Sequence, residues 1–188
     1  MEAHGEDEEL MLLYGAGDAR AFERLYARHK GGVFRFLRRQ CAGNAVAEEL
    51  FQDVWLRVVS ARASYTPSAK FTTWLYTIAH NRLMDHYRSL GRRPPHASLD
   101  DEDAPIAEPV ADPAESPERA LDRKRAAGRI VAAVEALPGA QREAFLLQQE
   151  AGLSVEEIAQ TTGVPFETAK SRLRYALAKL RADLESTR

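Results

Sequence analysis

The residues with the clearest potential for chemistry lie between Phe166 and Leu184, where basic, hydroxyl and aromatic side chains recur at helical spacing. At about 100° per residue, an apolar stripe leaves a polar face on the other side of this helix. That face and its two flanks carry Glu167, Thr168, Lys170, Ser171, Arg172, Arg174 and Tyr175. Cations bind phosphates and small polar groups reach base edges, so the pattern suits duplex DNA. A solvated helix face is the alternative interpretation.

A short helix precedes this one and favours the DNA interpretation. Ser154 can cap the short helix, and Glu157 closes a capping box. Gly163 supplies a turn, and Pro165 suits the first turn of the second helix. The stripe expected to bury the second helix is Ala169, Leu173, Ala176, Leu177, Leu180 and Leu184. Together the two elements predict a helix-turn-helix whose second helix enters a major groove.

A second group with chemical potential lies on a helix expected from Lys70 to Leu90. Phe71, Leu75 and Ile78 predict the core side of that helix. The other side carries Tyr76, His80 and Tyr87, with Arg82, Arg88, Arg92 and Arg93 nearby. Exposed rings beside cations are what single-stranded nucleic acid uses for stacking and backbone contacts. Packing of these rings against a neighbouring helix is the alternative.

The other reactive residue types form no recognisable site. His80 and His86 are six residues apart, a poor spacing for sharing a metal on one helix face, and the remaining histidines have no partner pattern. The single cysteine, Cys41, excludes an internal disulfide and a cysteine-cluster metal site. Without a nucleophile, metal or cofactor constellation, the sequence predicts a protein that is not an enzyme and binds no cofactor.

Helices are also expected in the segments that precede the aromatic helix. One opens at Leu10, and a second follows an N-cap at Asp18 and is expected to kink or break at Gly31-Gly32. A third covers residues 45–60, and its expected core side is Leu50, Val54, Leu56 and Val58. Its polar side carries Glu48, Glu49, Gln52 and Asp53. This polar side is either a solvated acidic first turn or a docking patch for a basic partner.

Two further features complete the helical pattern. Thr66 or Ser68 is expected to cap the aromatic helix, and Gly91 is expected to end it. Residues 119–150 are again helical, with a stop at Pro138-Gly139.

Charge is segregated along the chain, although the formal net charge is only −2. Residues 1–9 hold five acids and no Lys or Arg, whereas residues 10–93 hold fourteen Lys and Arg against six Asp and Glu. Residues 94–118 hold eight acids, no Lys or Arg and several prolines, which predicts an extended linker. Residues 119–188 hold twelve bases and nine acids. Two basic blocks around an acidic spacer indicate two surfaces that meet a polyanion.

Neither a membrane span nor a targeting segment is expected. No apolar run approaches the roughly 20 residues that a bilayer requires, and the acidic N-terminus does not resemble a signal peptide. The sequence therefore predicts a soluble, cytoplasmic protein.

The motifs, and the order in which they occur along the chain, resemble those of the extracytoplasmic-function (ECF) sigma factors of bacterial RNA polymerase over about residues 10–185. The stretch ALPGAQREAFLLQQEAGLSVEEIAQTTGVPFETAKSRLRYALAKLR, from Ala136, is similar to the fourth conserved region of the family. AEELFQDVWLRV and FTTWLYTIAHNRLMDHYR resemble the core-binding and promoter-melting parts of its second region. The resemblance implies an all-α protein of two small domains, region 2 at 10–93 and region 4 at 119–188, joined by the flexible linker at 94–118 and preceded by an acidic tail at 1–9.

The resemblance also implies roles for particular residues. The docking site for the polymerase clamp helices would be Glu49, Leu50, Gln52 and Asp53. The melted minus-10 strand would meet Tyr65, Lys70, Trp74, Tyr76, His80, Asn81 and Arg88. The duplex minus-35 element would meet the face from Glu167 to Tyr175, and Tyr175 stands where many members carry arginine. The expected partners are core polymerase (clamp helices and flap), promoter DNA and an anti-sigma factor.

Two alternatives belong to other classes of protein. One is an autonomous helix-turn-helix regulator, and the other is a helical interaction protein that uses its acidic patch and binds no DNA. An assay of transcription initiation with core polymerase and promoter DNA distinguishes the three interpretations, because only a sigma factor is expected to give promoter-dependent transcripts.

Overall fold

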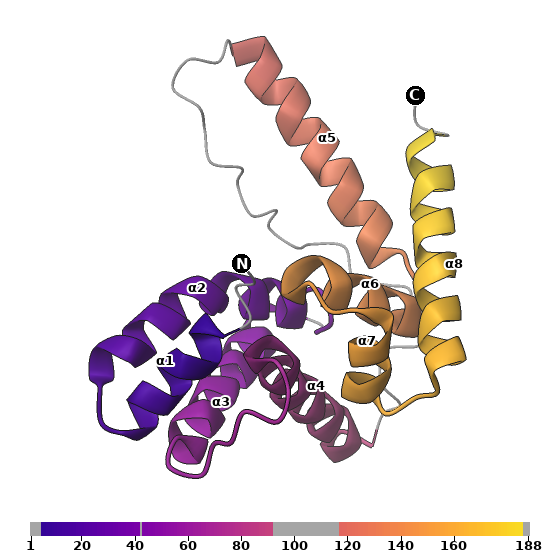
Figure 1. The fold of residues 1–188 in the computed structure, drawn as a ribbon. Helices are drawn as coiled ribbons and strands as arrows, with labels where there is room; N and C mark the ends of the chain where they lie inside the picture. The colour runs from indigo at the N-terminus through magenta and orange to yellow at the C-terminus, as the bar shows by residue number, and fades with distance from the viewer. Residues whose placement is uncertain (1–4, 42, 92–116, 186–188) are drawn as a thin grey trace.

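The structure, a computed structural model, describes residues 5–41, 43–91 and 117–185. These residues form eight helices and no strand, as Figure 1 shows. The helices are α1 (Glu6–Gly15), α2 (Ala19–Arg38), α3 (Asn44–Ala61), α4 (Phe71–Ser89), α5 (Pro117–Glu135), α6 (Gly139–Ala151), α7 (Val155–Thr162) and α8 (Phe166–Glu185). The predicted all-α fold class is confirmed. The predicted linker lies almost entirely outside the described residues.

Local sequence signals determine several helix ends. The Asp18 side chain accepts a hydrogen bond from the Arg20 N–H at 2.9 Å and caps α2. Ser154 and Glu157 form both halves of the predicted capping box at the start of α7. Gly163 ends α7 in the left-handed region with φ of 67°, where the absence of a Cβ removes the steric cost. These predictions are confirmed because each depends only on neighbours in sequence.

Two local predictions are wrong, and the second is wrong because a distant segment intervenes. Helix α2 runs without a break through Gly31-Gly32. Neither Thr66 nor Ser68 caps α4; instead the Glu8 carboxylate accepts a hydrogen bond from the Phe71 N–H. Glu8 belongs to α1, which begins at Glu6, so residues 6–9 of the predicted acidic tail are helical.

The acids of α1 hold it against α2. Glu6 pairs with Arg24 at 2.8 Å, and the buried Asp7 pairs with Arg28 and with His29, the latter at 2.7 Å. Burial alone would raise the pKa of Asp7, but the hydrogen bonds and positive charges of His29 and Arg28 outweigh it and hold that pKa below its usual value. The predicted acidic tail is therefore in part a structural element of the N-terminal bundle.

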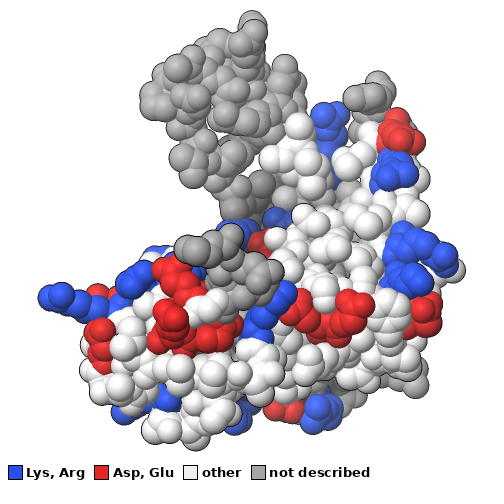
Figure 2. Space-filling model, viewed as in Figure 1, with Lys and Arg blue, Asp and Glu red and all other residues white. Residues whose placement is uncertain are grey.

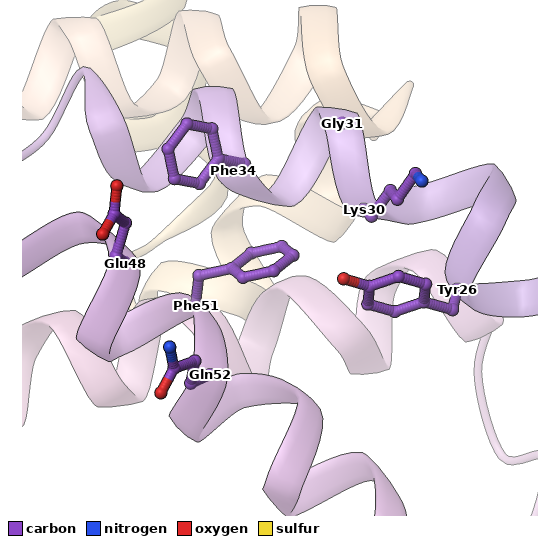
Figure 3. A pocket seen from close by; sticks show the side chains of 7 residues that line it. All are labelled: Tyr26, Lys30, Gly31, Phe34, Glu48, Phe51 and Gln52. Atoms are coloured by element: carbon purple, nitrogen blue, oxygen red, sulfur yellow. The ribbon is translucent and has the colours of Figure 1, made fainter. Parts of the chain in front are cut away.

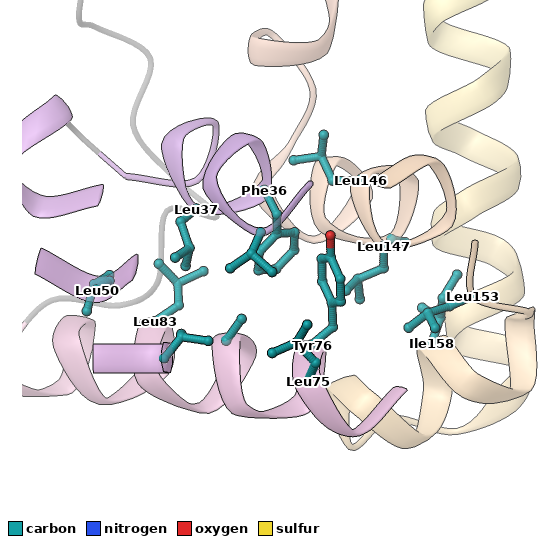
Figure 4. Packing of buried hydrophobic residues seen from close by; sticks show 14 of the residues in the cluster. Phe36, Leu37, Leu50, Leu75, Tyr76, Leu83, Leu146, Leu147, Leu153 and Ile158 are labelled. Atoms are coloured by element: carbon teal, nitrogen blue, oxygen red, sulfur yellow. The ribbon is translucent and has the colours of Figure 1, made fainter. Parts of the chain in front are cut away.

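One continuous apolar core joins the two halves of the chain. Helices α1–α4 form an N-terminal bundle, and α6–α8 pack together around Leu147, Leu153 and Ile158. Helix α6 also packs on α2 and α4, and α7 packs on α4. Figure 4 shows Tyr76 of α4 among Phe36 of α2 and the leucines of α6. Direct packing between the halves was not predicted from the sequence.

Candidate nucleic-acid interface

The helix-turn-helix of α7 and α8 buries the side of α8 that the sequence predicts, over most of its length. Ala169, Leu173, Ala176 and Leu180 are all less than a tenth exposed. Leu177 and Leu184, predicted for the same stripe, are 42% and 40% exposed, so that part of the prediction is wrong. At about 100° per residue, Leu177 and Leu184 lie at the edge of the buried stripe, towards the flank that carries Lys170.

The opposite side of α8 faces solvent. Glu167, Lys170, Arg174 and Tyr175 are exposed, and Thr168, Ser171 and Arg172 are half-buried beside them. The Arg174 guanidinium lies 5.0 Å from the centre of the Tyr175 ring and donates a 3.3 Å hydrogen bond to its hydroxyl. Lys and Arg side chains gather along this helix in Figure 2. All seven residues predicted to meet duplex DNA are therefore on one accessible, partly basic face.

The residues predicted to meet single-stranded DNA are not gathered on one accessible face. Asn81 and Arg88 are exposed, and Lys70 and Trp74 are half-buried. Tyr65, Tyr76 and His80 are buried, with exposed fractions of 8%, 1% and 9%. For Tyr76, His80 and Tyr87 the structure supports the alternative of packing against neighbouring helices, because α4 has neighbours on both sides rather than one.

Helix α6 accounts for the burial of Tyr76 and His80. The Tyr76 hydroxyl donates to the Glu150 carbonyl at 3.3 Å, and burial is the main reason that the pKa of this tyrosine is raised above its usual value. His80 Nδ1 lies 2.6 Å from Glu143 Oε1, and both side chains are buried. The hydrogen-bond partners of both side chains thus come from the C-terminal half of the chain.

Tyr65 is buried for a different reason, within the N-terminal bundle. Its ring packs edge-on against Trp74 at 5.0 Å and against Phe71 at 6.4 Å. Burial, together with the negative charges of Glu8 and Asp7, raises the pKa of Tyr65 to about 12. The Tyr65 ring therefore packs inward and anchors the loop before α4 to the bundle, and it is not presented on the surface of that loop.

The predicted docking residues of α3 divide into three groups. Glu49 and Gln52 are exposed, as is the neighbouring Glu48. Leu50 is only 3% exposed and belongs to the core, which does not support a direct contact with a partner. Asp53 is half-buried and forms an ion pair with Arg82 of α4, which ties it to the fold.

The exposed side of α3 also borders an aromatic groove that sequence reasoning missed. The groove lies between α2 and α3, has a volume of about 530 Å³ and opens to solvent. Figure 3 shows Tyr26, Phe34 and Phe51 around it, with Glu48 and Gln52 at one side. Leu56, predicted to face the core, is 62% exposed on the same helix. Tyr26 and Phe34, eight residues apart on α2, were the available signal.

Other kinds of site are not evident in the part of the chain that the structure describes. No group of three or more His, Cys, Asp and Glu residues there could hold a metal ion. Burial raises the pKa of the Cys41 thiol to about 12, so this cysteine is a poor nucleophile at neutral pH. No described helix has both the length and the apolar content needed to cross a membrane.

Two family models match the chain, one in the N-terminal bundle and one in the C-terminal half that contains the helix-turn-helix. Residues 25–93 match Sigma-70 region 2, and residues 127–180 match Sigma-70, region 4. The first match covers most of α2 and all of α3 and α4, and the second covers much of α5, all of α6 and α7, and most of α8.

Curated relatives align with nearly the whole chain. The chain is 35% identical to RNA polymerase sigma factor CarQ of Myxococcus xanthus over 89% of its own length and 90% of the relative. It is 31% identical to RNA polymerase sigma-H factor of Pseudomonas aeruginosa over 89% and 88%. It is 32% identical to ECF RNA polymerase sigma factor SigM of Mycobacterium tuberculosis over 93% and 82%.

Solved structures share the fold. CnrH, in complex with the cytosolic domain of CnrY, matches with a TM-score of 0.65 at 23% identity, over 96% of this chain and 98% of that one. The sigma factor RpoE from Bartonella quintana, in complex with the anti-sigma factor NepR, matches with a TM-score of 0.66 at 22% identity, over 90% and 100%.

Proposed function

Because the chain belongs to the ECF sigma factors of the sigma-70 family, we propose that it binds core RNA polymerase, reads the minus-35 element as duplex and holds the melted minus-10 strand. The observation that carries the proposal is the accessible polar face of α8 on a helix-turn-helix, in a chain where both family regions match in order. The protein acts as a regulatory transcription factor rather than as an enzyme.

The minus-35 contacts would come from the N-terminal half of α8. Arg172 and Arg174 suit phosphates, whereas Thr168 and Ser171 can reach base edges. Tyr175 is 53% exposed and offers a ring for stacking or for apolar contact with a thymine methyl group. Phosphate contacts would supply affinity, and the short polar side chains with Tyr175 would supply selectivity.

The polymerase contact would come from the exposed side of α3 and the adjoining aromatic groove. Glu48, Glu49 and Gln52 provide an acidic and polar rim for a basic partner surface. Leu56 and the groove rings provide the apolar part that stable interfaces need at their centre. Family membership further supports an anti-sigma partner and action in the cytoplasm, where polymerase meets the chromosome.

The experiment that tests the proposal is initiation in a purified system. We expect promoter-dependent transcripts when the protein is mixed with core polymerase and a library of promoter fragments. The protein alone should bind duplex weakly, because half of its DNA contacts require polymerase to hold the promoter. Tight, sequence-specific duplex binding without polymerase, together with no transcripts, would instead favour the autonomous helix-turn-helix regulator.

Replacing Arg172 by alanine should weaken promoter binding and make it less dependent on salt. Loss of one phosphate contact lowers the slope of log K against log salt by about 0.9, because one fewer counterion is released. Salt titration of polymerase holoenzyme on a promoter duplex measures that slope. Arg129→Ala in α5 is the control, because this arginine is exposed and lies outside α8. An unchanged slope in Arg172→Ala would remove this arginine from the phosphate contacts.

A further inference from the structure

The face of α4 that would hold single-stranded DNA is covered by the C-terminal half of the same chain. Tyr76 stacks edge-on against Phe36 at 5.5 Å, and its hydroxyl reaches the Glu150 carbonyl of α6. His80 is buried against Glu143, also of α6. Figure 4 shows the Tyr76 hydroxyl pointing away from α4 towards α6. Two aromatic rings expected to contact bases are therefore unavailable in this arrangement.

Two ion pairs and one histidine–carboxylate contact, here together called the closing pairs, connect the two halves around these rings. Arg35 of α2 pairs with Glu150 at 2.7 Å, Lys70 pairs with Glu157 of α7 at 3.1 Å, and His80 lies 2.6 Å from Glu143. The Thr73 hydroxyl also donates to Glu157 at 3.2 Å. In each pair the base comes from the N-terminal bundle and the carboxylate from α6 or α7. The carboxylates thus occupy cations that DNA phosphates would otherwise attract.

A glycine allows the halves to approach this closely. A Cβ on Gly32 would lie 2.6 Å from the Tyr76 hydroxyl and 3.1 Å from the Glu150 carbonyl oxygen. Glycine in the middle of a helix costs stability relative to alanine, yet α2 continues through this position. Gly32 is therefore a point where α2, α4 and α6 meet, and a side chain there would have to displace the Tyr76 hydroxyl and shift the Glu150 carbonyl.

The face of α8 proposed for duplex DNA is not covered by this contact. Arg174 and Tyr175 are exposed, and the buried stripe of α8 packs on α6 and α7 rather than on the N-terminal bundle. We propose that the closed arrangement is autoinhibitory: it covers the part of α4 that would hold the melted strand and leaves the duplex-reading face of α8 open. The inference rests on the proposed function, since it assigns α4 to single-stranded DNA.

The apparent affinity for single-stranded DNA then depends on the open fraction of the protein. For a ligand that binds only the open form, the apparent dissociation constant equals the intrinsic constant divided by the fraction of molecules that are open. If about a tenth of the molecules are open, a variant that is fully open gains about tenfold in single-strand affinity. Duplex affinity at α8 stays the same, because both forms present that face.

Gly32→Ala in the full chain tests the closure, with Gly5→Ala as the control. A Cβ on Gly5 has no atom within 4 Å, and Gly5 has a right-handed helical backbone that alanine adopts, so that variant should stay closed. We expect Gly32→Ala to show a larger radius of gyration in X-ray scattering. It should also bind a labelled non-template minus-10 oligonucleotide about tenfold more tightly in fluorescence anisotropy. Binding of a labelled minus-35 duplex should differ less than about twofold among the three proteins.

A charge-swap series tests the closing pairs independently of Gly32. Arg35→Glu and Glu150→Arg each place like charges together and should open the protein in the same way. The double variant restores an opposite pair and should return both the scattering profile and the single-strand affinity towards wild type. Recovery in the double variant separates a closing contact from a general loss of structure, and it decides the question if Gly32→Ala folds poorly.

Two results would overturn the proposal. If neither Gly32→Ala nor the single charge variants expand, the closing pairs do not hold the halves together. If they expand without a gain in single-strand affinity, closure is not inhibitory and α4 is not the strand-binding face. Promoter-dependent initiation by the wild-type protein is a separate measurement. Its result tests the sigma-factor function independently of the closure.

Discussion

Replacing Phe71 by alanine is expected to lower the free energy of unfolding by about 3–5 kcal/mol, the range for removing a fully buried aromatic ring. Phe71 has no exposed surface and is the first residue of α4. Its ring lies 5.3 Å from His29 and 5.7 Å from Trp74, so its loss leaves a cavity between α2 and α4. The loop that precedes α4 would lose its support at the same time.

Urea unfolding followed by circular dichroism measures this loss, and Phe166→Ala is the matched control. Phe166 is also the first residue of its helix, α8, but it is 39% exposed and contacts Lys170 at 5.7 Å from its ring centre. Its replacement should cost about 1 kcal/mol or less. Equal losses at the two positions would show that phenylalanine stabilises these helix starts for reasons other than burial.

The parts of the fold that could be predicted from sequence are those that local spacing determines. The capping box of Ser154 and Glu157 needs only residues three apart, and Asp18 caps α2 through an N–H two residues away. The polar face of α8 follows from the helical repeat once most of the opposite stripe is buried. For the same reason the family regions could be identified from their motifs.

The errors arise where a segment distant in sequence changes a local preference. Glu8 replaces the expected caps of α4 from 63 residues away. Gly32, expected to break α2, instead provides room for Tyr76 and the backbone at Glu150. Helical periodicity assigns one buried side to each helix, but α4 is buried on two sides because α6 and α7 pack on the face that carries Tyr76 and His80. No periodic signal in α4 itself reports those neighbours.

The same difference between local spacing and distant contacts applies to the residues proposed for polymerase docking. The prediction placed Leu50, Leu56 and Val58 together on the core side of α3. Leu56 is exposed because six residues at about 100° each turn it away from Leu50, onto the side that carries Glu49 and Gln52. Family resemblance assigned Leu50 and Asp53 to the partner, whereas the core and Arg82 already engage them. Glu49 and Gln52 are the assigned residues whose exposure fits the role.

Glu49→Arg is expected to weaken binding to core polymerase about 100-fold or more. Glu49 is exposed and forms no ion pair with another described residue, so its reversal should leave the free energy of unfolding within about 0.5 kcal/mol of wild type. A positive charge facing a basic partner surface costs several kcal/mol, whereas the glutamate attracts it. Asp53→Arg is a poorer test, because it would place two cations together where Asp53 now pairs with Arg82.

Glu185→Arg separates docking from a general effect of charge. It makes the same change in net charge at the end of α8, far along the chain from the α2–α3 groove and outside both proposed DNA faces. Equilibrium binding to labelled core polymerase should therefore be nearly unchanged in Glu185→Arg and strongly weakened in Glu49→Arg. Equal weakening in both variants would mean that polymerase responds to overall charge, and normal binding by Glu49→Arg would exclude the exposed side of α3 as the docking surface. The groove rings then become the remaining candidates in this part of the molecule, because their apolar contacts do not depend on the sign of a charge at the rim.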